Sequence, residues 1–102
     1  MSSISFPEDI ASLDISKLAK AMLTILRKEH KGERNAVKAS ELAYKMQRMF
    51  PNIAGSYSVS GLKGSVSKIG RMLVKYELIK SKLSSSNPSD PESFNVYWYW
   101  VE

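Results

Sequence analysis

The spacing of the apolar residues changes once along this chain, at Tyr76, and that change limits the folds open to it. Before Tyr76 the apolar residues recur every three or four positions, which is typical of amphipathic helices. After it they alternate with polar residues, which is typical of half-buried strands. The chain is therefore predicted to place its helices first and a β-hairpin last, giving an α+β domain that is mainly α.

Three helices are predicted before the hairpin. Asp14 and Ser58 are the expected N-caps of the first and third, because short polar side chains accept hydrogen bonds from the first helical turn. Val37 is expected to form a short extended segment before the second helix. The stretch PNIAGSY is expected to be a loop, because Pro51 and Gly55 interrupt helical spacing there. The predicted helices span about residues 14–31, 38–50 and 58–76.

Two strands, over residues 78–83 and 94–101, are predicted to form the hairpin. A polar loop of ten residues with two prolines, SSSNPSDPES, separates them, so the tip of the hairpin is expected to be long. Residues 1–13 are expected to form an irregular arm, which leaves residues 14–102 as one domain.

The second strand carries the aromatic run YWYW. Its alternation predicts that Phe94, Trp98 and Trp100 cover the helices, whereas Tyr97 and Tyr99 lie on the outer face. A platform on which bases stack is the alternative interpretation of this run. Completion of a small core is the interpretation that we favour, because a domain of this size needs its large apolar side chains inside.

The third predicted helix combines regular apolar spacing with weak helix formers. Leu62, Val66, Ile69 and Leu73 form one apolar stripe, yet residues 58–76 also contain three glycines and four serines. Each interior glycine costs about 1 kcal/mol relative to alanine. The stability of this helix must therefore come from packing of the stripe rather than from intrinsic propensity.

The net charge of +5 is concentrated in residues 56–83. That segment contains six cations and one anion, Glu77, whereas the nine cations and nine anions elsewhere cancel. Concentrated positive charge is expected of a surface that meets phosphates, and a solvated lysine-rich face is the alternative. The face of the third helix opposite its apolar stripe has no acid, and it carries Ser60, Gly64, Ser67, Lys68, Arg71 and Lys75.

The order of the predicted elements, with the stretches VKASELAYKM and SVSKIGRMLVKYELIKSK, resembles a winged-helix domain over roughly residues 14–101. The pattern is similar to small bacterial and archaeal transcriptional regulators, including those of archaeal viruses. The resemblance implies a winged helix-turn-helix: three helices plus a two-stranded wing, with the third helix in a DNA major groove.

On that resemblance we expect a sequence-specific double-stranded DNA-binding protein, a transcriptional regulator for which a homodimer is one option. Small side chains near the start of the third helix would let its backbone approach the base edges. Arg71 is the expected base contact, because a guanidinium can bond bidentately to guanine. The expected DNA-binding residues are Ser60, Lys63, Gly64, Ser65, Ser67, Lys68, Arg71, Lys75, Lys80 and Lys82.

The predicted hairpin tip departs from the usual wing, which presents Arg or Lys to DNA. Residues 84–93 contain no cation and two acids, Asp90 and Glu92, so phosphates should repel the tip. This motivates a second hypothesis, in which the domain is a protein-interaction module within a larger complex. The candidate surfaces for a homodimer are the arm, the first helix and the aromatic strand.

The sequence gives no support for catalysis, and we expect no enzyme activity, cofactor, metal or small-molecule ligand. His30 is the only histidine and is expected to be a capping or solvated residue. The chain has no cysteine and no recognisable phosphate loop, nucleophile elbow or metal-ligand spacing. No apolar run approaches the ~20 residues of a membrane span. The start of the chain lacks the features of a signal peptide. A cytoplasmic or nucleoid-associated location is therefore expected, or the host cytoplasm for a viral protein.

Overall fold

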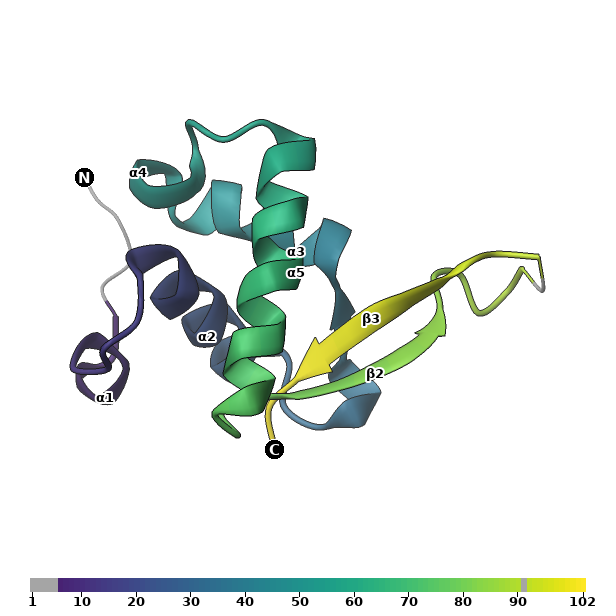
Figure 1. The fold of residues 1–102 in the computed structure, drawn as a ribbon, viewed down its shortest axis with the longest axis horizontal. Coiled ribbons are helices and arrows are strands. Elements are labelled where there is room, and N and C mark those ends of the chain that lie inside the picture. Colours follow the sequence, from purple (N-terminus) through teal and green to yellow (C-terminus); the bar gives the residue numbers. More distant parts are fainter. Residues whose placement is uncertain (1–5, 91) are drawn as a thin grey trace.

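The computed structural model describes residues 6–90 and 92–102 as a mainly helical α+β fold with a three-stranded antiparallel sheet. The helices form the body of the molecule, and the hairpin extends away from them (Figure 1). None of the described helices is long and apolar enough to cross a membrane. The helices are α1 (Glu8–Ala11), α2 (Lys17–Glu29), α3 (Ala39–Met49), α4 (Pro51–Ala54) and α5 (Val59–Lys75), with a 3₁₀ turn η1 (Glu33–Asn35). The strands are β1 (Val37–Lys38), β2 (Lys80–Ser85) and β3 (Asn95–Trp100).

The three long helices lie close to their predicted ranges, and the caps explain the differences. The Ser58 hydroxyl accepts a hydrogen bond from the Gly61 N–H at 3.1 Å, which confirms the predicted start of α5. Asp14 is not the cap of α2. Ser16 takes that role by accepting from the Ala19 N–H at 3.1 Å, so α2 begins at Lys17.

The predicted loop after α3 contains a short helix, α4. Pro51 occupies its first helical position, where the N–H that proline lacks has no intrahelical partner to lose. Ala54 at the end of α4 is fully buried, so contact with the core favours this turn where local sequence signals predict a loop.

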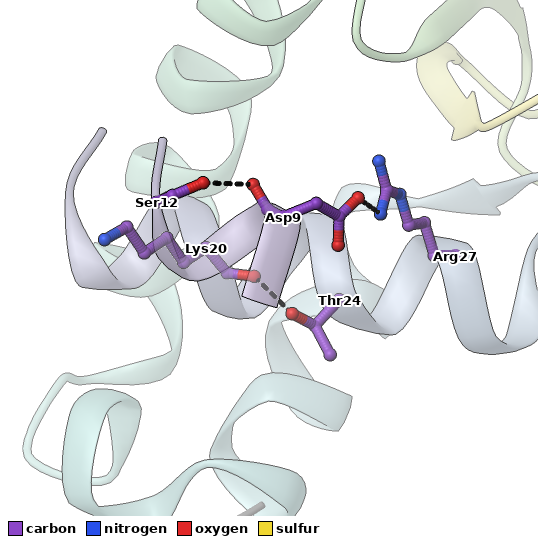
Figure 2. Close-up of polar contacts among 5 residues, drawn as sticks. All are labelled: Asp9, Ser12, Lys20, Thr24 and Arg27. Atoms are coloured by element: carbon purple, nitrogen blue, oxygen red, sulfur yellow. Dashed lines mark hydrogen bonds and ion pairs between the residues drawn. The ribbon is translucent and has the colours of Figure 1, made fainter. Parts of the chain in front are cut away.

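The predicted irregular arm contains α1, which is attached to α2 by a buried side chain and by polar contacts (Figure 2). Ile10 is fully buried in the core. The Asp9 carboxylate accepts a hydrogen bond from Arg27, and this interaction lowers the pKa of Asp9. The Lys20 ammonium donates to the Ala11 carbonyl at 2.7 Å, at the end of α1. Residues 1–5 of the predicted arm lie outside the described residues.

The sheet has the order β1-β3-β2, so a third strand joins the predicted two-stranded hairpin. The extended segment predicted at Val37 forms this strand, because Val37 pairs with Tyr99 and Lys38 pairs with Trp98. The pairing of β1 with β3 connects the segment between α2 and α3 to the C-terminal strand. The hairpin is therefore anchored to the helical body at the end where its two strands meet α5.

The predicted faces of the aromatic strand are reversed relative to α5. Tyr99 is 2% exposed and faces α5, whereas Phe94 is 74% exposed near the far end of the hairpin. Trp100 is also buried, on the opposite face from Tyr99. Both faces of β3 are covered at this end, so alternation alone does not tell which face meets the helices. Tyr97 shares the α5-facing side with Tyr99, although its side chain is half exposed, whereas Trp98 lies on the opposite face with Trp100.

Gly70 of α5 is the point at which the helix meets the sheet. A Cβ atom at Gly70 would lie 2.6 Å from Cε1 of Tyr99 and 2.8 Å from its Cζ. Gly70 is itself buried and lies in the same helix as the buried residues Leu62, Val66 and Leu73. The glycine thus permits close packing, and its partner is a tyrosine of β3.

We expect Gly70→Ala to lower the free energy of unfolding by about 1–3 kcal/mol, because the added methyl group overpacks the buried ring of Tyr99. Gly64→Ala is the matched control. A Cβ at Gly64 meets no atom within 4 Å, so this change should stabilise the helix by about 1 kcal/mol. Urea unfolding followed by circular dichroism measures both. Equal effects of the two substitutions would contradict the assigned packing.

Burial raises the pKa of Tyr99 above its ordinary value of 10.0, and the neighbouring Ser67 hydroxyl and Arg71 charge act in the opposite direction. The unfolded chain therefore loses this proton at a lower pH than the folded protein does. The stabilisation is fully present below about pH 10 and is lost as the pH rises through the folded-state pKa.

The free energy of unfolding of the wild type should consequently decrease above about pH 10, and Tyr99→Phe should reduce that decrease. Denaturant unfolding at a series of alkaline pH values measures the difference between the two proteins. Parallel pH curves would show that the Tyr99 hydroxyl is not protected by the fold.

Candidate nucleic-acid interface

Packing of one side of α5 against the core determines which of its side chains reach solvent. The buried residues of α5 are Leu62, Val66, Gly70 and Leu73, in agreement with most of the predicted apolar stripe. Ile69 is only partly buried. Of the predicted site residues on this helix, Ser65 and Ser67 are half-buried, and the exposed ones are Ser60, Lys63, Gly64, Lys68, Arg71 and Lys75.

The cations of α5 are not neutralised by the rest of the protein. In residues 6–90 and 92–102, no carboxylate lies within 4.0 Å of Lys63, Lys68, Arg71 or Lys75. The first turn of α5 also contains no acid. Carboxylates elsewhere do pair with cations, and the pairs are Arg27–Asp9, Lys45–Glu29 and Lys82–Glu33. The outward face of α5 is therefore a region of uncompensated positive charge.

The glycines at the start of α5 have different explanations. A Cβ at Gly61 would lie 2.9 Å from the Ser58 hydroxyl oxygen, so this glycine leaves room for the helix cap. Gly64 has no such neighbour, and no packing contact requires a glycine there. Gly64 lies on the exposed face of α5. That location is required by the prediction that small residues let the backbone of this helix approach DNA.

The structure does not bring Lys80 and Lys82 together with the cations of α5. Lys82 lies directly opposite Trp98 in the sheet, and the two side chains therefore share a face. Ser81, opposite Tyr99, belongs to the other face, which meets α5. The Lys82 ammonium also donates to a carboxylate oxygen of Glu33, at 3.2 Å. The sequence pattern places the lysines on a strand but does not show which side of the sheet α5 occupies.

A groove of about 330 Å³ separates α5 from the hairpin and the start of α3. Two aromatic side chains on its rim, Phe94 and Tyr97, are well exposed. Tyr97 also borders a smaller hollow of about 220 Å³ next to Arg71. The larger groove is lined by Lys38, Ala39, Ser40, Lys63, Ser67, Ser86, Phe94, Val96, Tyr97 and Tyr99.

Sequence analysis missed Lys38 and Ser40 as residues of this surface, because nothing local shows that the start of α3 lies next to the hairpin. The Lys38 ammonium donates to the Ser86 carbonyl at 3.0 Å and lies 5.9 Å from the centre of the Trp98 ring. Lys38 thus links the start of α3 to the loop end of β2. Lys38 lines the groove, but its ammonium lies over the Trp98 ring, on the face of β3 opposite Tyr97 and Tyr99.

His30 serves the fold as the C-cap residue of α2, in agreement with the predicted capping role and not with the solvated alternative. Its Nδ1–H donates to the Asn35 carbonyl at 2.6 Å, and its Nε2 accepts from the Lys45 ammonium at 2.9 Å. Within the described part of the chain, no three His, Cys, Asp or Glu side chains gather in a way that could hold a metal ion.

Comparisons with protein-family models, with curated proteins and with solved structures gave no match to this chain. The proposed function therefore depends on the candidate interface itself. Its two features are the uncompensated charge on α5 and the aromatic-lined groove beside it.

Proposed function

We propose that this protein binds double-stranded DNA in a sequence-specific manner, as a transcriptional regulator with a winged helix-turn-helix arrangement. The observation that carries the proposal is the set of four cations on the outward face of α5 that have no carboxylate partner in the described chain. The order of α2, α3, α5 and the β2–β3 hairpin also agrees with such an arrangement.

In this proposal α5 lies in the major groove, which is about 12 Å wide. Ser60 and Gly64 are small residues, so the backbone of the first turns of α5 can approach the base edges. Arg71 extends from the same face and can bond bidentately to guanine O6 and N7. Lys68 and Lys75 contact phosphates on either side of the groove.

The groove between α5 and the hairpin is the proposed path of one sugar–phosphate backbone. Lys63 and Ser67 supply a charge and a hydroxyl from α5, and Ser40 supplies a hydroxyl from α3. Tyr97 offers an exposed aromatic ring against the sugars. Lys80 and Lys82 are left out of the interface, because they project from the other face of the sheet.

A protein-interaction module is the second candidate function, and the exposed aromatic side chains of the hairpin favour it. Phe94 is 74% exposed and Tyr97 is 50% exposed, and the acids Asp90 and Glu92 lie nearby in the sequence. Such a surface suits a protein partner better than it suits phosphates. A measurement of DNA binding by the wild type distinguishes these two candidate functions.

Lys68→Glu combined with Arg71→Glu should weaken binding to duplex DNA by about 100-fold or more, because it removes a base contact and a phosphate contact and adds repulsion. Lys17→Glu combined with Arg34→Glu is the control. It makes the same change in net charge on exposed residues of α2 and η1, and it should weaken binding far less. Fluorescence anisotropy with random-sequence duplexes at two salt concentrations measures both variants.

For the wild type, the three phosphate contacts proposed for the lysines of α5 should make log K fall with log salt at a slope of roughly −3. Absence of binding at low salt would reject the DNA-binding proposal and favour the protein-interaction module. Equal losses in the two double variants would show that only net charge matters.

Lys63→Gln should weaken binding and reduce the salt slope by about 1, because Lys63 lies on the groove between α5 and the hairpin. Lys80→Gln should change neither quantity measurably, since that side chain lies on the opposite face of the sheet. The same titrations compare the two variants. A larger effect at Lys80 would mean that DNA meets the other side of the sheet.

A further inference from the structure

Strand β2 forms an edge of the sheet. It pairs with β3 on one side, and within residues 6–90 and 92–102 no strand pairs with its other side. Figure 1 shows this outer edge running along the hairpin, clear of the helices for most of its length. An edge strand of six residues presents a row of backbone N–H and C=O groups that another strand can bind.

The pairing within the hairpin fixes which groups point outward. The Ser86 N–H donates to the Phe94 carbonyl at 2.9 Å, so these two residues form a hydrogen-bonded pair. In an antiparallel ladder such pairs alternate with pairs that are not hydrogen-bonded. The residues of β2 whose backbone groups face outward are therefore Ser81, Leu83 and Ser85. The Ser85 carbonyl also accepts from the Trp98 indole N–H at 3.1 Å, which leaves its second lone pair for a further donor.

An uncovered apolar pair lies at the middle of this edge. Leu83 is 53% exposed, and its direct partner across the hairpin, Tyr97, is 50% exposed. The two side chains share one face of the sheet. On the other face, the charge of Lys82 is paired with Glu33, which lowers the repulsion that a second lysine-bearing strand would meet.

We propose that β2 is the site at which a second copy of this chain binds, in an antiparallel strand pair with a twofold axis at Leu83. In this register Leu83 of one copy lies opposite Leu83 of the other copy. The two Tyr97 rings lie beside these two leucines. Ser81 pairs with Ser85 of the other copy, so the outward-facing backbone groups of both strands meet. Lys82 then lies opposite Ser84, and no lysine lies opposite another.

The charges of the strand select this register over its neighbours. An axis at Lys82 would place the two copies of Lys82 opposite each other, and an axis at Ser81 would place Lys80 opposite Lys82. Like charges in directly opposed positions destabilise a sheet. An axis at Ser84 or Ser85 avoids this repulsion, but it separates the two leucines and pairs fewer residues of β2.

The proposed pairing joins the two sheets into one, with the twofold axis normal to it. Both copies of α5 then lie on the same face of the joined sheet, since a twofold axis normal to a sheet preserves its faces. The aromatic strand, a candidate dimer surface on sequence grounds, is β3 and lies inside the sheet, so β2 provides the edge. The inference does not rest on DNA binding, and it can fail while DNA binding holds.

The test is the molar mass of the purified protein, measured by sedimentation equilibrium from low micromolar to millimolar concentration. The wild type should form a dimer. Leu83→Pro should be monomeric and folded, because it removes an N–H that points outward and leaves the bonds to β3 intact. Phe94→Ser removes an exposed apolar side chain outside β2 and should remain dimeric. A monomeric wild type, or a folded Leu83→Pro variant that is still dimeric, would overturn the proposal.

A second measurement keeps the proposal testable if Leu83→Pro does not fold. The chain has no cysteine, so Leu83→Cys introduces a single thiol at the proposed axis. Opposed strand residues lie about 5.5 Å apart at their Cα atoms, which suits a disulfide. Under mild oxidation this variant should form a covalent dimer much faster than Phe94→Cys does. Equal rates for the two variants would overturn the proposal.

Discussion

The contact between Gly70 and Tyr99 determines how the helices meet the sheet. Tyr99 pairs with Val37 on one side and with Ser81 on the other, and the Gly70 backbone lies against its ring. Since α5 can approach so closely only where it has no side chain, this contact fixes the rotation of the helix about its axis. The same rotation turns Arg71 outward, so the exposed cations depend on a buried glycine.

The placement of the acids has as much effect on the surface as the placement of the cations. Hydrogen bonding to Arg27 lowers the pKa of Asp9, and hydrogen bonding to Lys45 lowers the pKa of Glu29. Both carboxylates therefore stay ionised, and their charge neutralises cations of α2 and α3. On α5 the four cations have no carboxylate within 4.0 Å among the described residues. The protein has a directed electrostatic field although its net charge is moderate.

The sequence was sufficient to predict features that depend on local interactions. The Ser58 cap and the buried side of α5 follow from composition and spacing within one segment, and the structure confirms both. The features that it missed depend on contacts between distant segments. Helix α1 forms where Ile10 reaches the core, and the face of Tyr99 depends on where α5 lies. The sequence wrongly predicts that Lys80 acts together with α5, because a strand pattern gives the alternation of side chains but not the identity of each face.

At Gly64, a substitution can change the surface of the protein without lowering its stability. Substitutions that change the function of a protein often also lower its stability, which limits how many such changes one fold can accept. Open space surrounds the position of its missing Cβ, on an exposed turn of the helix. If α5 binds DNA as proposed, side chains introduced there would change the contacts with DNA without affecting the core. The position is one from which related sequences could diverge in specificity while keeping the same fold.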